Sequence, residues 1–318
     1  MRVLTLLASL FTALALSFPA AAQLQGKRVA LLTAPVQSPY IGVMNAAFIK
    51  VLDAQGVKVT NLTTPYDAAI QSQQVDDAIG QKFDLIAIQP SNHVAIIPAL
   101  ERAAKAKVPV VLLIAPLEPG NERLYVTVVG NDQAELGSIA GNELIKALAG
   151  KPAKVAIIQG ASTQNLVQLR TIGFKQTIAK APNIKLVAIE SANWRTDMAE
   201  NMARQLFVRF SPQGGLQGIY AMADNMAAGV IQAAESAGLN PGKDLIVVSS
   251  TCQKEGIPNI RNGKQFSAVD QIPAREGTIS ANVVLRVLKG EAVKKNEIIP
   301  AKAVDKSNVE EYAKACAF

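Results

Sequence analysis

Short apolar runs alternate with helical patterns along almost the whole chain, and this alternation constrains the fold more than any other feature. The first run, Lys27-Arg-Val-Ala-Leu-Leu-Thr33, has a charged start and a continuous apolar middle. Such a run is typical of a strand buried on both faces of a parallel sheet. Because the strands alternate with helices of about 10 to 15 residues, the pattern predicts βαβ crossovers and an α/β fold.

The alternation occurs twice, which predicts two lobes. The chain has 318 residues, 49% of them apolar, so it is long enough to bury two cores. The first series predicts strands at 27–33, 57–62, 84–89 and 108–114, and helices at 41–55, 67–81 and 94–105. The second predicts strands at 154–159, 185–191, 218–222, 244–249 and 264–270, and helices at 137–148, 166–180, 198–210, 226–237 and 277–288, before a polar tail. We therefore expect two doubly wound parallel sheets.

The two series meet in the stretch 126–137. We interpret it as a strand that crosses from one lobe to the other and leads into a helix. Asp132 stands just before the helical spacing begins, so it is expected to cap that helix. No low-complexity segment separates the halves, which indicates lobes joined by short connections.

Ligands of open α/β sheets bind beyond the carboxyl ends of the strands. The loops expected there are 34–40, 89–92, 115–121 and 160–165, and two facing sheets would enclose a cleft. Gly160-Ala-Ser-Thr lacks the G-x-G-x-x-G spacing of a dinucleotide fold and the lysine of a phosphate loop. No cofactor is therefore expected.

The N-terminus has the pattern of a secretory signal peptide. Met1-Arg2 is a short basic start, 3–18 is apolar, and Ala20-Ala21-Ala22 supplies the small residues of a cleavage site before Gln23. The apolar run is shorter than the ~18 to 20 residues that a membrane-spanning helix needs. Residue 23 is not cysteine, so no lipid anchor is expected. The signal peptide is assigned to 1–22, and the mature protein to the periplasm.

Charge and composition argue against several other classes of function. Without Arg2, 31 basic residues face 25 acidic ones, and the excess of six is scattered without interleaved aromatics, so no nucleic acid partner is expected. His93 is the single histidine and no cysteine cluster exists, so no metal site is expected. No Gly-x-Ser-x-Gly elbow accompanies His93, which is expected at the surface or as a cap. The sequence therefore predicts a protein that is not an enzyme.

Cys252 and Cys316 are the only cysteines. In an exported protein disulfides can persist, and the two residues form a bridge only if their Cα atoms approach within ~7 Å. The sequence leaves open whether they pair.

Eight short motifs occur in order along the mature chain. They are Ser38-Pro39-Tyr40, Asp84-Leu-Ile-Ala-Ile-Gln-Pro90, Val108-Pro-Val-Val111, Val129-Gly-Asn-Asp132 with Gly137, Arg170-Thr-Ile-Gly-Phe174, Ala192-Asn-Trp194, Asp224-Asn-Met-Ala-Ala-Gly229 and Asp270-Gln271-Ile-Pro273. With them the chain resembles the periplasmic sugar-binding proteins of the ribose/galactose type, which share their lobes with the ligand cores of lactose-repressor-like regulators. The signal peptide and the missing helix-turn-helix favour the exported binding protein.

The resemblance implies a three-stranded hinge, with crossings near 130, 271 and 300 and a ligand cleft between the lobes. The N-terminal lobe then comprises 23–130 and 272–300, and the C-terminal lobe 131–271 and 301–318. The ligand-binding residues that it implies are Ser38, Tyr40, Gln89, Asn131, Asp132, Arg170, Trp194, Thr251 and Gln271. Aromatic rings stack on the apolar faces of sugars, and arginine and amides bond their hydroxyls.

This chain departs from the family at its acidic residues. Where sugar binders carry a carboxylate after the fourth strand it has Ile114-Ala115, the usual Asn before Asp224 is Ala223, and a second carboxylate is replaced by Thr251. Carboxylates accept paired bonds from sugar hydroxyls, so the usual clamp is missing.

Arg170 consequently needs a counter-charge in a closed cleft. Asp132 or Asp270 would supply it if the ligand is a neutral sugar or polyol; otherwise the ligand is a sugar acid. Arg170→Ala is expected to abolish ligand stabilisation and to leave the unliganded melt nearly unchanged.

The function expected from the resemblance is that of the solute-binding component of an ABC importer. The protein would act as a monomer, close around a small polar solute, and dock on inner-membrane permease subunits. The alternative is a periplasmic sensor that presents the bound solute to a chemoreceptor or a histidine kinase.

Overall fold

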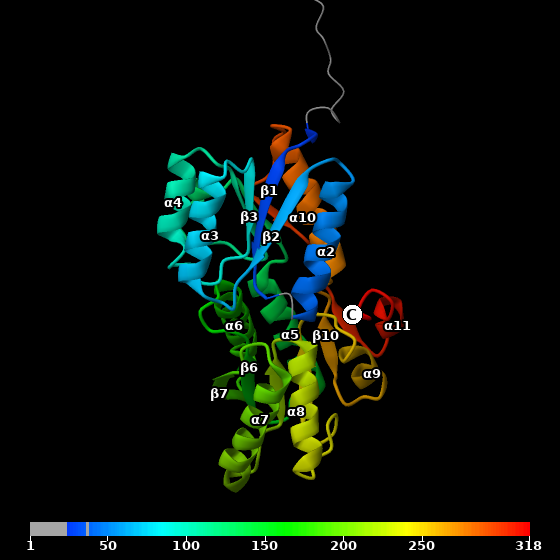
Figure 1. Ribbon diagram of the computed structural model, residues 1–318. Coiled ribbons are helices and arrows are strands. Elements are labelled where there is room, and N and C mark those ends of the chain that lie inside the picture. Colours follow the sequence, from blue (N-terminus) through cyan, green and yellow to red (C-terminus); the bar gives the residue numbers. More distant parts are fainter. Residues whose placement is uncertain (1–23, 36–37) are drawn as a thin grey trace, which may run out of the picture.

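The computed structural model describes residues 24–35 and 38–318, which form two lobes stacked end to end (Figure 1). Each lobe contains a six-stranded sheet flanked by helices. The expected α/β fold with two doubly wound lobes is therefore confirmed. The predicted signal peptide lies outside the described residues.

The first sheet has the strand order β11-β5-β4-β3-β1-β2, and all its strands run parallel. Its strands are β1 (Arg28–Thr33), β2 (Lys58–Thr63), β3 (Leu85–Ile88), β4 (Val110–Leu113), β5 (Thr127–Gly130) and β11 (Asn296–Ile298). The helices of this lobe are α2 (Pro39–Asp53), α3 (Ala68–Gly80), α4 (Ile97–Lys105) and α10 (Pro273–Leu288), with a 3-10 turn, η1, at Glu122–Leu124. Side chains of β1 alternate between two cores: Val29 and Leu31 belong to the one that contains α2, Ala30 and Leu32 to the one under α3 and α4.

The second sheet has the order β12-β10-β9-β8-β6-β7. Its strands are β6 (Ala153–Gln159), β7 (Ile184–Ser191), β8 (Gly218–Ala221), β9 (Ile246–Ser249), β10 (Ser267–Val269) and β12 (Ala303–Asp305). Its helices are α5 (Gln133–Leu148), α6 (Asn165–Ile178), α7 (Thr196–Phe210), α8 (Asp224–Ser236), α9 (Gly256–Arg261) and α11 (Val309–Tyr312), with a second 3-10 turn, η2, at Ser211–Gln213. The expectation of a purely parallel sheet is wrong at one edge, because β12 pairs antiparallel with β10.

The predicted polar tail contains two of these strands. β11 and β12 each have three residues and carry Asn296, Glu297 and Asp305, so neither shows an apolar run. Both are edge strands, β11 beside β5 and β12 beside β10. An edge strand needs only one paired side and tolerates polar residues, which is why the sequence pattern missed them.

The chain passes between the two sheets three times: after β5, after β10 and between β11 and β12. The stretch 126–137 was predicted as a strand that crosses between the lobes. It instead contains β5, which lies entirely within the first sheet, and the start of α5 at Gln133. Asp132 caps α5 as expected, since its carboxylate accepts from the amides of Ala134 and Glu135 at 2.9 and 3.1 Å.

Hydrogen bonds join the three crossings side by side. The Asn131 side chain donates to the carbonyl of Ile299 at 2.8 Å, which joins the first crossing to the third. The Asp270 amide donates to the carbonyl of Lys302 at 2.9 Å, and the Lys302 amide donates back to the Asp270 carboxylate at 2.6 Å. The third crossing is therefore bonded to both of the others.

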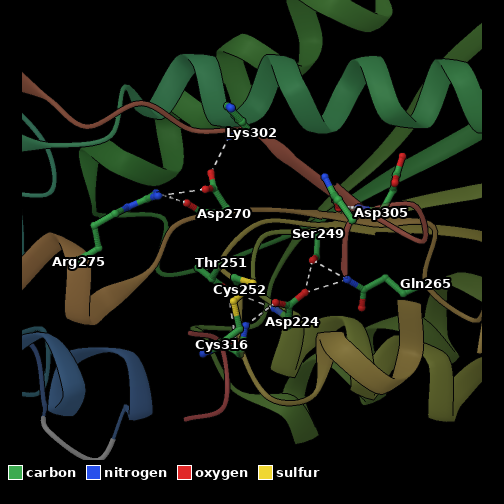
Figure 2. The surroundings of a disulfide bond; sticks show 12 residues. Asp224, Ser249, Thr251, Cys252, Gln265, Asp270, Arg275, Lys302, Asp305 and Cys316 are labelled. Atoms are coloured by element: carbon green, nitrogen blue, oxygen red, sulfur yellow. Dashed lines mark hydrogen bonds and ion pairs between the residues drawn. A yellow bond between two sulfur atoms is a disulfide. The ribbon is translucent and has the colours of Figure 1, made fainter. Parts of the chain in front are cut away.

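Cys252 and Cys316 form a disulfide, with their Cα atoms 5.1 Å apart (Figure 2). The bond joins the loop after β9 to the segment after α11. The pairing that the sequence left open is thus made, and the C-terminal segment is fixed to the second lobe.

His93 lies between the lobes, so its predicted surface or capping position is wrong. Its side chain is 5% exposed, and its ring nitrogens contact the Thr163 carbonyl at 3.2 Å and the Glu118 carboxylate at 2.7 Å. The local cap is Asn92, which accepts from the next amides. The sequence around His93 indicates the start of a helix. It could not show that a loop of the second lobe, which contains Thr163, covers the ring.

Within the described ranges, no helix has both the length and the apolar character needed to cross a membrane. The same residues contain no group of three or more His, Cys, Asp or Glu side chains that could hold a metal ion.

Candidate functional site

A cavity of about 530 Å³ lies between the lobes and is lined by residues of both. Most of its walls are loops that follow strands or begin helices, as expected for parallel sheets that face one another. Of the residues implied by the sequence, those in the lining are Ser38, Tyr40, Gln89, Arg170, Trp194, Thr251 and Gln271.

Asn131 and Asp132 do not line this cavity. The amide of Asn131 bonds the third crossing, and the carboxylate of Asp132 caps α5. A chain that leaves a sheet and starts a helix exposes backbone groups that need partners, and these two side chains meet that need. We therefore assign them to the hinge and not to ligand binding.

Tyr40 supplies an aromatic wall from the first lobe. It stands in the first turn of α2, and its hydroxyl donates to the carboxylate of Glu276 in α10. Glu276 is 1% exposed, and burial raises its pKa to about 7, against the hydrogen bond from Tyr40 and the charge of Arg170. Burial, with the charge of Glu276, also raises the pKa of Tyr40 well above its usual value. The Tyr40 hydroxyl therefore keeps its proton and uses it in the hydrogen bond to Glu276, while the ring lines the cavity.

Arg170 comes from α6 in the second lobe and is 1% exposed. Its guanidinium donates to the Gln133 side chain at 2.9 Å, the Met222 carbonyl at 3.0 Å and the Gln271 side chain at 2.6 Å. Close packing of α5 on α6 fixes this position, because a Cβ on Gly137 would lie 2.0 Å from the Arg170 carbonyl oxygen. Arg170 therefore joins the second lobe to two of the crossings.

The counter-charge expected for Arg170 is neither Asp132 nor Asp270. Asp132 is a cap, and Asp270 forms an ion pair with Arg275 at 3.2 Å. The acidic group linked to Arg170 is Glu276 instead: Gln271 accepts from Arg170 at 2.6 Å and donates to the Glu276 carboxyl group at 3.4 Å. Since Glu276 follows Arg170 by 106 positions and lies on a helix of the other lobe, no local pattern could have paired the two residues.

Trp194 supplies the aromatic wall of the second lobe. It lies between β7 and α7 with a left-handed backbone, φ 63°, and its indole nitrogen donates to the Gln164 side chain at 2.7 Å. The Arg170 guanidinium carbon is 5.7 Å from the ring centroid. The indole also lies directly on Gly160, where a Cβ would be 2.0 Å from the ring. Gly160 is thus required for the position of Trp194, which explains the glycine at the end of the β6 strand.

Gly160→Ala is expected to displace the indole and to weaken the binding of any solute in the cavity by about 5- to 150-fold, because a forced overlap of this kind costs about 1 to 3 kcal/mol. Trp194 is the only tryptophan, so its emission spectrum reports the displacement directly. Gly80→Ala is the control, since nothing lies within 4 Å of a Cβ built there. An emission spectrum for Gly160→Ala that superimposes on that of the unaltered protein would contradict this role.

The loop after β9 contributes cavity residues that the sequence analysis did not single out. Thr251 has a left-handed backbone, φ 63°, and Gln253 and Glu255 join it in the lining. Glu255 is half-buried, and no other residue among 24–35 and 38–318 forms a hydrogen bond or ion pair with its carboxylate. Its signal in the sequence was only a carboxylate in a loop after a strand, which is too common to assign.

The buried Asp224 side chain fixes the position of this loop through hydrogen bonds. Its buried carboxylate accepts from the Gln253 amide at 2.8 Å, from the Gln265 side chain at 2.8 Å, and from the Ser249 hydroxyl (Figure 2). Burial raises the pKa of Asp224 to about 7, although these hydrogen bonds oppose the rise. Asp224 is therefore a structural support of the cavity and does not line it.

Comparison with known proteins gives consistent matches in sequence and structure. A family profile described as a periplasmic binding protein domain matches residues 29–292. The galactofuranose-binding protein YtfQ of Escherichia coli is 31% identical over 212 residues, 65% of this chain and 65% of that protein. The ribose import binding protein RbsB of Salmonella typhimurium is 27% identical over 301 residues, 94% of this chain and 98% of that protein. The crystal structure of a galactofuranose binding protein superimposes on this chain with a TM-score of 0.85 at 23% sequence identity. The match covers 91% of this chain and 98% of that protein's chain.

Proposed function

This chain belongs to the family of periplasmic binding proteins, and on that premise we propose that it is the solute-binding component of an ABC importer. The solute would be a small neutral sugar or polyol, held in the cavity between the lobes. The observation that carries the proposal is a cavity lined by Tyr40 from one lobe and Trp194 from the other, with amide side chains between them. Two aromatic faces with polar groups around them suit a molecule with apolar faces and a rim of hydroxyls.

The charges of the cavity support a neutral solute over a sugar acid. The Arg170 guanidinium donates to three acceptors inside the protein and is linked to Glu276 through Gln271, so it does not require an anionic ligand. The carboxylate of Glu255 lines the cavity, has no ion-pair partner in the part of the chain that the structure describes, and would repel a second carboxylate. We assign Glu255 as an acceptor of solute hydroxyls, in place of the acidic residues absent at positions 114–115 and 251.

A thermal-shift panel tests this assignment. D-ribose, D-allose, L-arabinose, D-galactose, xylitol and myo-inositol would be compared with D-gluconate and D-galacturonate. A neutral solute at about 100 times its dissociation constant should stabilise the protein by ~2.7 kcal/mol and raise its melting temperature by several degrees. Glu255→Gln should reduce that shift, whereas Glu235→Gln, at a surface ion pair with Lys264, should not.

A larger shift with a sugar acid than with every neutral compound would overturn the neutral assignment. A sensor would use the same cavity, so solute uptake by a strain that lacks the gene separates import from signalling.

A further inference from the structure

The last ten residues, 309–318, form a C-terminal arm that packs beside the binding cavity without lining it. The arm begins with α11 and is bound to the second lobe through the Cys252–Cys316 disulfide (Figure 2). Cys252 stands between Thr251 and Gln253, which both line the cavity. The covalent anchor of the arm is therefore inside the binding loop itself.

Apolar contacts fix the arm firmly to this loop. Val309 and Cys316 are buried in one cluster with Cys252, Ile257 and Ile260, separate from the main cores of the lobes. At the surface, Arg261 forms a two-bond ion pair with Glu310, with both distances 2.6 Å. The arm, α9 and the loop after β9 thus form one packed unit.

The arm ends on the other lobe. The Phe318 ring meets the Tyr40 ring edge to face, with centroids 6.3 Å apart and an interplanar angle of 71°. Tyr40 is consequently held at two points: its hydroxyl by Glu276 and its ring by Phe318. Phe318 does not line the cavity, so any effect it has on a solute passes through Tyr40.

We propose that the C-terminal arm positions the binding site from both sides, with the disulfide holding the loop 251–255 and Phe318 holding the Tyr40 ring. Phe318 is thus a positioning residue, and solute affinity depends on the integrity of the arm. The inference about affinity rests on the proposed function; the inference about the position of Tyr40 and of the loop does not.

Two measurements test the proposal. The first is hydrogen exchange of the unliganded protein, followed in residues 41–46 behind Tyr40 and 251–256 around Cys252. The second is a D-ribose titration monitored by Trp194 emission. Phe318→Ala should accelerate exchange in 41–46 and raise the D-ribose dissociation constant by about 3- to 10-fold, the usual strength of one aromatic pair. The double variant Cys252→Ser, Cys316→Ser should accelerate exchange in 251–256 and weaken D-ribose binding at least as much.

Phe318→Tyr keeps the ring and should restore both values, which a general loss of stability would not do. Val208→Ala, at the most exposed large apolar side chain recorded, is the surface control and should change neither. Unchanged exchange in 41–46 for Phe318→Ala, or faster exchange spread evenly over both lobes, would overturn the proposal. If D-ribose does not bind the unaltered protein, that result counts against the choice of solute, and the exchange data alone decide the role of the arm.

Discussion

Arg170→Ala should abolish solute binding and should also lower the free energy of unfolding of the unliganded protein by about 3 to 5 kcal/mol. The substitution removes three hydrogen bonds to buried acceptors, together with the positive charge that lowers the pKa of Glu276. From the sequence, the unliganded melt was expected to stay nearly unchanged. Burial of the guanidinium reverses that expectation.

Urea unfolding without solute measures this loss, and the thermal-shift panel measures binding. Arg195→Ala is a matched control on the same cavity, since the Arg195 side chain is 63% exposed and pairs with Asp197 at the rim. Glu276→Gln added to Arg170→Ala should recover part of the lost stability, because it removes the uncompensated carboxylate. An Arg170→Ala protein as stable as the unaltered one would show that Glu276 does not depend on Arg170.

The stability of the protein should fall as the pH rises from about 4 to above 7. Burial raises the pKa of Glu276 and of Asp224 to about 7, whereas their ordinary values are 4.5 and 3.8. The folded protein thus binds more protons than the unfolded chain within this range. The stability that these two carboxyl groups contribute is fully present below their ordinary pKa values and is lost as the pH passes about 7, about 3 to 4 kcal/mol for each group.

Urea unfolding at intervals between pH 5 and pH 8 checks this prediction. Glu276→Gln and Asp224→Asn should each flatten the pH dependence, since neither replacement can ionise. Asp84 has a pKa lowered by its bonds to Lys27 and Arg28, although burial opposes it, and its contribution is lost only as the pH falls below the ordinary value of 3.8. Asp84→Asn is therefore the control and should leave the slope between pH 5 and pH 8 unchanged. Equal or greater stability at pH 8 than at pH 5 would contradict the prediction.

The sequence predicted those parts of the fold that depend on local periodicity. The apolar runs that became β1, β3 and β4 are buried throughout or nearly so, and their composition reflects that burial directly. The short elements α9, α11, β11 and β12 were not predicted, because none has enough residues to display a period. Their positions are set by packing against longer elements.

The residues of the candidate site were also predicted only in part. Tyr40 and Trp194 could be selected because the family resemblance, through the motifs Ser38-Pro39-Tyr40 and Ala192-Asn-Trp194, implies aromatic side chains at these positions. The partners of these residues could not be predicted, since Glu276, Gly160 and Phe318 contact them from distant parts of the sequence. The environments of His93 and Arg170 were predicted wrongly for the same reason. The residues that bury these side chains lie in the opposite lobe or in the crossings between the lobes.

The hydrogen bonds among the crossings restrict how the lobes can move. Because the third crossing is bonded to the first through Asn131 and to the second through Asp270, no crossing can bend alone. Three connections tied together in this way must bend together, which favours one shared path of lobe motion. On the proposed function, solutes of different shape would stop the lobes at different points on that path, and a permease would sense the extent of closure and not the identity of the solute.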